Sequence, residues 1–134
     1  MKLFDKKIMI IDDDATDRFI LRKVLENITK AEVVEFDSGL KALENLTNIS
    51  KDKPTFRQLI FLDVNMPVLD GFGFLDALNQ LSGEYKTRCH IIFISSHVND
   101  PERKKISSYA NVIGYFEKPV KEESLLELKK IIQV

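Results

Sequence analysis

Three short runs of apolar residues constrain the fold most strongly, because each is unbroken instead of alternating with polar residues. The runs are Ile8–Ile11, Leu59–Leu62 and Ile91–Ile94. A strand with one solvated face alternates apolar and polar side chains, whereas a strand of a parallel sheet is buried on both faces and is apolar throughout. Two shorter segments rich in β-branched and aromatic residues, Val33–Phe36 and Val112–Phe116, are also typical of strands. The sequence therefore predicts a parallel sheet of five strands.

Helical periodicity occupies the segments between these strands. Apolar residues recur at helical spacing in residues 15–28, and Ser38 is a suitable N-cap for a second helix through Leu40–Ile49. The polar stretches Thr47–Gln58 and Ser82–His90 are expected to be long connections. Three further helices are predicted at Phe72–Leu81, Pro101–Ala110 and Glu122–Ile132. Alternating strands and helices predict an α/β domain, a (βα)5 doubly wound sheet with helices on both faces.

Composition narrows the classes of function. The chain has 134 residues, the size of one domain. Its 20 Lys+Arg and 21 Asp+Glu give a net charge of -1, so we expect neither nucleic acid nor a membrane as a partner. Cys89 is the only cysteine, which excludes an internal disulfide and a cysteine-rich zinc site. Only four consecutive apolar residues occur near the N-terminus, so we expect no signal segment and a cytoplasmic location.

Polar and charged residues follow most of the predicted strands. Along the chain these are Asp12, Asp13 and Asp14, then Asp63, then Ser95 and Ser96, then Lys118. Because ligands of doubly wound sheets bind beyond the carboxyl ends of the strands, we expect these side chains to share one site. Two carboxylates about 4 Å apart repel by about 4 kcal/mol at an effective dielectric constant of 20. A hard divalent cation relieves this repulsion, and oxygen ligands favour Mg²⁺.

Such a set of groups suits phosphoryl transfer. With the charge neutralised, one carboxylate can attack a phosphoryl group and form an aspartyl phosphate. A hydroxyl and the Lys118 ammonium can bind the oxygens of the transferred group. Taken singly, an acidic turn after a strand or a lysine at the surface is more often structural. Their coincidence at four strand ends favours a functional site.

Four segments resemble one known family. IMIIDDD, FLDVNMPVLDG, FISS and GYFEKP, in this order, closely resemble the receiver domain of bacterial two-component response regulators, over essentially the whole chain. The resemblance implies a stand-alone, chemotaxis-regulator-like receiver over residues 1–134 without an output domain, with the flavodoxin-like strand order 2-1-3-4-5. It further implies phosphorylation by a sensor histidine kinase or a phosphotransfer protein, and signalling to a downstream protein. Such a domain assists its own phosphotransfer but is not classed as an enzyme.

The resemblance also implies residue roles. Asp63 corresponds to the phosphoacceptor, and Asp12 and Asp13 to the acidic pair that holds Mg²⁺ together with Asp63 and the backbone carbonyl of Asn65. Lys118 corresponds to the lysine that pairs with the phosphoryl group.

Further roles concern the switch and the neighbouring loops. Ser95 corresponds to the switch hydroxyl, with Ser96 as a rival, and Tyr115 to the aromatic residue that moves with it. Asp70 is expected to be structural, and the peptide bond before Pro119 to be cis.

Two alternatives remain open at this point. Asp12, Asp14 and Thr16 form a DxDxT pattern that resembles the first motif of haloacid-dehalogenase-type phosphatases, with Asp12 as nucleophile. This alternative leaves FLDVNMPVLDG without a role. The chain also lacks the cap that such phosphatases usually carry and the pair of acidic residues expected near their C-terminal end. The second alternative is a receiver-like binding module that is never phosphorylated.

Overall fold

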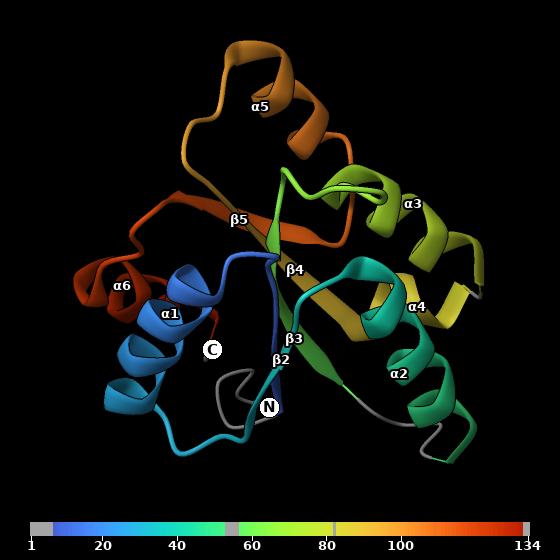
Figure 1. Cartoon of the computed structure of the whole chain (residues 1–134), viewed down its shortest axis with the longest axis horizontal. Helices are drawn as coiled ribbons and strands as arrows, with labels where there is room; N and C mark the ends of the chain where they lie inside the picture. Colours follow the sequence, from blue (N-terminus) through green and yellow to red (C-terminus); the bar gives the residue numbers. More distant parts are fainter. Residues whose placement is uncertain (1–6, 53–56, 82, 133–134) are drawn as a thin grey trace.

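The five predicted strands form one all-parallel sheet. The computed structural model describes residues 7–52, 57–81 and 83–132. Within these ranges the strands lie in the order β2-β1-β3-β4-β5 (Figure 1). Their bounds are β1 Ile8–Ile11, β2 Val33–Phe36, β3 Gln58–Asp63, β4 Cys89–Ser95 and β5 Val112–Glu117. The predicted fold class and strand order are confirmed.

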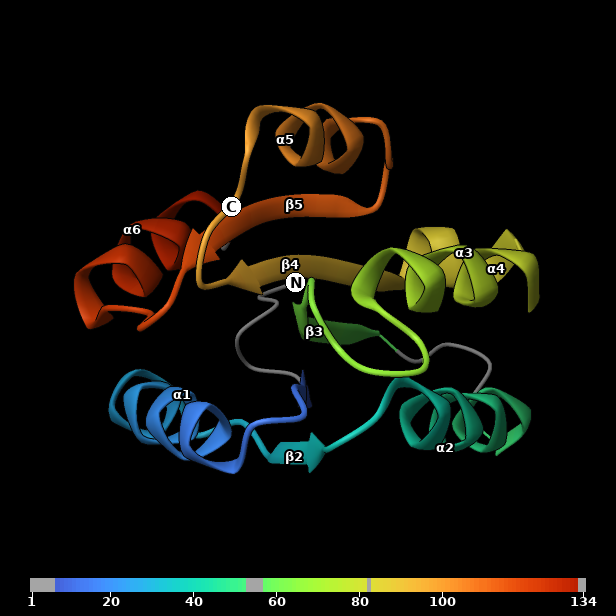
Figure 2. The ribbon, with the colours of Figure 1, turned by 45° about the horizontal axis from the view of Figure 1, so that its top comes forward.

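Helices cover both faces of the sheet. Their bounds are α1 Ala15–Ile28, α2 Gly39–Asp52, α3 Gly71–Leu81, α4 Gly83–Arg88, α5 Asp100–Ser107 and α6 Glu122–Ile132. Figure 2 shows α1 and α6 on one side of the sheet, α2, α3 and α4 on the other, and α5 beside β5. No helix within the described ranges is long and apolar enough to cross a membrane.

The unbroken apolar runs divide their side chains between two cores. In β1, Met9 and Ile11 pack in the layer with α2 and α3, whereas Ile8 and Ile10 pack in the layer with α1 and α6. All four side chains are fully buried. Because successive side chains of a strand point to opposite faces, a strand covered on both faces needs apolar residues at every position.

Polar caps begin the helices that follow the strand ends. The Asp14 side chain accepts the Asp17 N–H at 3.0 Å at the start of α1, and the Asn99 side chain accepts the Glu102 N–H at 2.9 Å at the start of α5. Ser38 Oγ accepts the Lys41 N–H at 3.2 Å, which confirms the predicted cap of α2. Each cap satisfies a backbone N–H that the helix leaves unpaired.

Two predicted connections are partly helical, which corrects the sequence interpretation. The α2 helix continues to Asp52, into the predicted connection Thr47–Gln58, whose residues 53–56 lie outside the described part of the chain. Thr47 fits the helix because its hydroxyl donates to the Leu43 carbonyl oxygen at 2.9 Å. The predicted connection Ser82–His90 contains α4, which packs against α3 and β4. A helix of six residues is too short to show a periodic pattern, and packing has to stabilise it.

Candidate functional site

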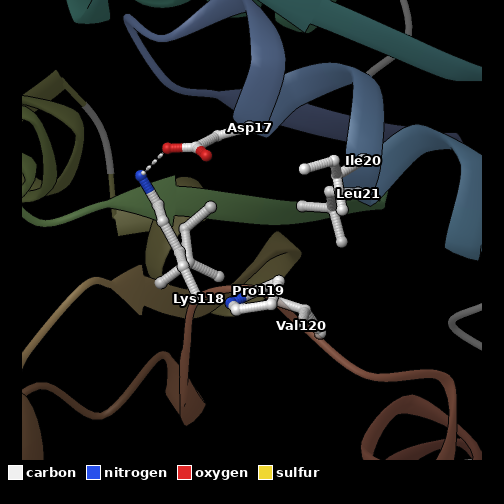
Figure 3. Close-up of a pocket in the computed structure, with 7 residues that line it drawn as sticks. Asp17, Ile20, Leu21, Lys118, Pro119 and Val120 are labelled. Carbon is white, nitrogen blue, oxygen red and sulfur yellow. Dashed lines mark hydrogen bonds and ion pairs between the residues drawn. The ribbon is translucent and has the colours of Figure 1, made fainter.

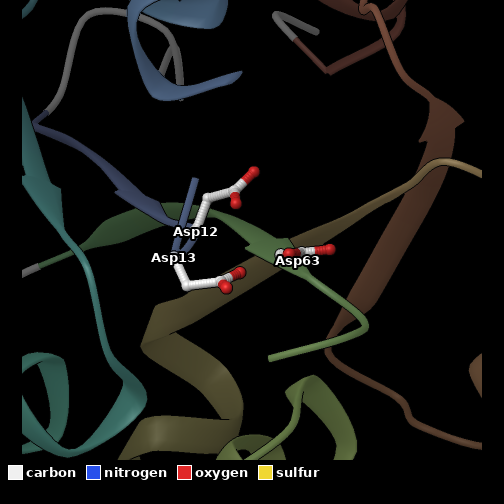
Figure 4. A group of neighbouring side chains, drawn as sticks. All are labelled: Asp12, Asp13 and Asp63. Carbon is white, nitrogen blue, oxygen red and sulfur yellow. The ribbon is translucent and has the colours of Figure 1, made fainter. Parts of the chain in front are cut away.

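Three carboxylates converge where β1 and β3 end. Ile11 pairs with Leu62 in the sheet, so the residues that follow them, Asp12 and Asp63, are neighbours at the carboxyl edge. Asp12, Asp13 and Asp63 each offer an oxygen, and these oxygens lie within 4.8 Å of one another (Figure 4). Asp12 and Asp63 are buried, with exposed fractions of 0% and 4%, whereas Asp13 is exposed. The structure therefore brings together the carboxylates that the sequence predicted.

Backbone contacts orient the two buried carboxylates. Asp12 Oδ1 accepts the Asp14 N–H at 2.9 Å, and Asp63 Oδ1 accepts the Asn65 N–H at 3.3 Å. The carbonyl oxygen of Asp12 accepts a hydrogen bond from Arg18 Nη1 at 2.7 Å. The remaining oxygen of each carboxylate, Oδ2, is left to face charged partners.

Lys118 supplies the positive charge of the site. Its Nζ lies 2.8 Å from Asp12 Oδ2, 2.9 Å from Asp17 Oδ2 and 3.4 Å from Asp63 Oδ2. The backbone N–H of Lys118 donates to the Ser95 carbonyl oxygen at 2.8 Å, which ties the segment after β5 to the end of β4. The peptide bond between Lys118 and Pro119 is cis, as predicted.

The ionisation of the site reflects its excess of negative charge. Burial and the neighbouring Asp12 charge raise the pKa of Asp63 to about 7, although Lys118 and the Asn65 N–H lower it. Burial lowers the pKa of Lys118, but its hydrogen bonds to Asp12 and Asp17 and the charge of Asp63 outweigh this and hold the pKa above its usual value. One ammonium therefore does not compensate the carboxylates around it.

The donor set fits a magnesium ion. Its side-chain donors are all carboxylate oxygens, which suit a hard cation, and Mg²⁺ characteristically takes one or two carboxylates and keeps several waters. Asp12 Oδ2 is buried, and the Lys118 ammonium 2.8 Å away is the cation that faces it. Such an oxygen gains most from a cation, because burial has removed the water that solvated it.

The structure distinguishes the two serines at the end of β4. Ser95 is the last residue of β4 and is fully buried, whereas Ser96 is exposed. Ser95 Oγ donates to the His97 carbonyl oxygen at 2.8 Å and accepts the His97 N–H at 3.2 Å. The hydroxyl that lies inside the molecule at the strand end is therefore that of Ser95. The sequence had left open whether Ser95 or Ser96 holds this position.

Tyr115 lies on β5, beside Phe93 of β4. Its side chain is half-buried, and the Arg103 guanidinium of α5 lies 5.4 Å from the centre of its ring. That distance is within the range of a cation–π interaction. Tyr115 thus connects the strand that precedes Lys118 with α5.

The loop after β3 holds Asp63 in place through Gly71. A Cβ atom at Gly71 would lie 2.5 Å from the Asp63 carbonyl oxygen and 2.9 Å from the Phe93 ring. Only glycine tolerates such a close approach of the backbone. Asp70 begins α3 as its cap, because its side chain accepts the Gly73 N–H at 2.7 Å, in agreement with the predicted structural role.

Two residues of the site were missed in the sequence. Asp17 and Arg18 follow the acidic run but lie at the start of α1, where the helix dipole favours an acidic residue and an arginine is by default a surface residue. The signal that could have found them is helical periodicity, since both lie about one turn after Asp13 and Asp14 and can turn back toward the strand ends.

The comparisons with known proteins agree with this geometry. The family model for the response regulator receiver domain matches residues 8–130. The chain belongs to the response regulator receiver domain family. It is a receiver of two-component signalling, a signalling domain of phosphorelay pathways.

The receiver matches segments of longer curated proteins. It is 29% identical over 136 residues to the histidine kinase CKI1 of Arabidopsis thaliana, covering 96% of this chain and 12% of the kinase. It is 31% identical over 114 residues to protein-glutamate methylesterase/protein-glutamine glutaminase 5 of Myxococcus xanthus, covering 84% of this chain and 30% of that protein. These curated relatives are therefore several times longer than the segment that the receiver matches.

Solved structures show the same fold. The crystal structure of a response regulator receiver protein from Dyadobacter fermentans superimposes with a TM-score of 0.80 at 26% identity, covering 94% of this receiver and 96% of that chain. The matched part of that protein is thus nearly its whole chain.

Proposed function

We propose that this receiver accepts a phosphoryl group on Asp63 from a phosphohistidine of a histidine kinase or a phosphotransfer protein. The observation that carries the proposal is the position of Asp63, buried between the acidic pair Asp12 and Asp13 and the Lys118 ammonium. Relatives that are histidine kinases carry a matching segment, which supports a donor of this class.

In the proposed reaction an oxygen of the Asp63 carboxylate attacks the phosphorus atom. The new O–P bond forms as the P–N bond to the donor imidazole breaks, and the imidazole retains the electron pair. Lys118, 3.4 Å from Asp63 Oδ2, is placed to bind an oxygen of the transferred group. Burial of Asp63 keeps this charge interaction strong, because little water screens it.

The magnesium ion belongs to the same proposal. Asp12, Asp13 and Asp63, with the backbone carbonyl of Asn65, would hold it. When bound, the ion supplies charge neutralisation at the carboxylates and at the phosphoryl oxygens. A deprotonated Asp63 is then available as the nucleophile, which its raised pKa otherwise opposes.

We assign the switch to Ser95 and Tyr115. Ser95 Oγ is engaged with the backbone of His97, so the hydroxyl has to leave this contact before it can donate to a phosphoryl group. That exchange biases a pre-existing equilibrium of the β4 and β5 ends, with Tyr115 moving inward. The surface of α5, β5 and α6 then presents the change to a downstream protein.

Acyl phosphate labelling tests the proposal. The receiver is incubated with Mg²⁺ and acetyl phosphate, and the modified residue is located by mass spectrometry after borohydride reduction. We expect modification of Asp63 and none in the Asp63→Asn variant. Modification of Asp12, or turnover of phosphate esters, would instead support the phosphatase alternative, and no modification by any donor would support the binding module.

The structure and the family leave the phosphatase alternative little support. Asp14, the second aspartate of its DxDxT pattern, is used as the cap of α1. The family match covers residues 8–130 and contains FLDVNMPVLDG, which the alternative left unexplained.

A further inference from the structure

The ion pair between Lys118 and Asp17 is unexpected from the proposed reaction. Asp17 lies in the first turn of α1, and its Oδ2 accepts a hydrogen bond from Lys118 Nζ at 2.9 Å (Figure 3). This distance is shorter than the 3.4 Å between Lys118 Nζ and Asp63 Oδ2. In the resting receiver, the lysine is therefore closer to Asp17 than to the proposed phosphoacceptor.

The surroundings strengthen this pair. Asp17 and Lys118 line a small pocket whose other walls are mainly apolar. The apolar lining comes from Ile20, Leu21, Ile94, Pro119 and Val120. The side-chain exposure is 13% for Lys118 and 34% for Asp17, so the pair is partly shielded from water. Apolar neighbours lower the local dielectric constant and increase the attraction between opposite charges.

The three partners of Lys118 are not equivalent. Asp12 is fully buried, with Oδ1 held by the Asp14 N–H, and Asp63 is the proposed phosphoacceptor. Asp17 is the most exposed of the three carboxylates, and solvent can replace the lysine there at the lowest cost. An ammonium has three N–H donors, so one of these partners has to yield when a phosphoryl oxygen arrives.

We propose that Asp17 is a positioning residue that competes with the phosphoryl group for Lys118. The inference rests on the proposed function of Asp63 and names a residue that sets how readily the site is occupied. Asp17 draws Lys118 away from the phosphoryl position and weakens binding of the anion. Its negative charge at the same time favours a divalent cation in the acidic cluster. Asp17 therefore shifts the balance of the resting site toward the metal and against the phosphoryl group.

The test measures the two ligands separately. Binding of beryllofluoride, a phosphoryl mimic, is titrated at saturating Mg²⁺ by backbone amide NMR, and Mg²⁺ binding is titrated in the absence of the mimic. We expect Asp17→Asn to bind beryllofluoride about two- to fivefold more tightly, the effect of a partly exposed ion pair. We expect the same variant to bind Mg²⁺ more weakly. A variant that merely loosens the site would bind both ligands more weakly.

Controls separate the local contact from other roles of Asp17. Glu26→Gln removes the same charge from an exposed site more than two turns further along α1, and we expect no gain in beryllofluoride affinity. Asp17→Glu keeps the carboxylate and is expected to restore affinities near those of the unsubstituted receiver. If the asparagine variant does not fold, Asp17→Ala serves as the second test, because alanine has the highest helix propensity.

The outcomes distinguish this inference from the proposed function. Beryllofluoride binding that is unchanged or weaker in Asp17→Asn overturns the role of Asp17 alone, as does an equal gain in Glu26→Gln. Failure of the unsubstituted receiver to bind beryllofluoride with Mg²⁺ overturns the proposed function, and the inference with it.

Discussion

Two charged clusters that each include side chains of α1 differ in their balance of charge. In the first, Glu35 of β2 accepts hydrogen bonds from Arg18 Nε and Arg22 Nε, so one carboxylate has two cations. In the second, Lys118 meets the carboxylates of Asp12, Asp17 and Asp63, so one cation has three anions. In the first cluster the Glu35 charge is balanced by the two arginines, whereas the second cluster keeps an excess of negative charge that a bound cation can neutralise.

The two clusters also differ in how deeply their carboxylates are buried, which determines what an unbalanced charge costs. The Glu35 side chain is 28% exposed, whereas those of Asp12 and Asp63 are 1% and 5% exposed. Partly exposed ion pairs contribute little to stability, but an uncompensated buried charge is costly. Arg18 touches both clusters, since its Nε donates to Glu35 and its Nη1 to the Asp12 carbonyl oxygen. The cluster around Glu35, in which the charges are balanced, thus helps to position the acidic cluster around Lys118.

Removing the single cation of the acidic cluster should have the largest effect. We expect Lys118→Met to lower the free energy of unfolding of the metal-free receiver by about 3 kcal/mol, because Asp12 and Asp63 lose their shared buried counter-ion. Urea denaturation in EDTA measures the change. Added Mg²⁺ should recover part of the loss. The exposed Lys121→Met variant is the matched control, and an equal loss there would show that the buried contact is unimportant.

Removing one anion should have the opposite effect. We expect Asp63→Asn to raise the free energy of unfolding of the metal-free receiver by about 2 kcal/mol at pH 8, because its charged form is disfavoured by burial and by Asp12. The same denaturation experiment measures it. Destabilisation by this substitution would show that the cluster carries no excess of negative charge.

The raised pKa of Asp63 also predicts how the stability of the receiver and its affinity for Mg²⁺ depend on pH. The pKa of Asp63 is raised to about 7 in the folded state, above its unfolded value of 3.8. The folded state therefore binds this proton more tightly, and the associated stability is present below about pH 4 and is lost as pH rises through 7. Because Mg²⁺ competes with that proton, we expect its affinity to fall about tenfold per pH unit below 7.

Calorimetric titration of Mg²⁺ between pH 5.5 and 8 measures this dependence. Asp63→Asn is the control, since the variant lacks the titrating carboxyl and should show a much weaker slope. A steep slope that survives in the variant would assign the proton to another group.

The smallest effect is expected in the balanced cluster. Arg22→Gln should lower the free energy of unfolding by at most about 1 kcal/mol, because Glu35 keeps Arg18 and both partners are partly exposed. Urea denaturation of this variant beside Lys118→Met compares the clusters directly. A loss as large as that of Lys118→Met would remove the distinction between them.

Much of the site could be predicted because it depends on short-range patterns. Asp12 and Asp63 each follow an apolar run, and parallel strands bring their carboxyl ends to one edge. Asp17 could not be predicted in this way, because it lies on a helix and its partner Lys118 is 101 residues away. Likewise, α4 and the end of α2 lack a periodic pattern of apolar residues. The α4 helix depends on packing, and the end of α2 continues a helix that has already begun.

The parallel sheet, its alternation with helices and the gathering of acidic residues at one edge all follow from the order of residues in the chain. The physical reason is that burial on both faces demands unbroken apolar strands, and strand ends then carry the polar residues. Three further properties depend on how the chain is folded: which serine is buried, the close contact that Gly71 permits with Asp63, and the way Lys118 divides its contacts among three carboxylates. These properties depend on distances between segments far apart in the chain, and residue order does not contain such distances.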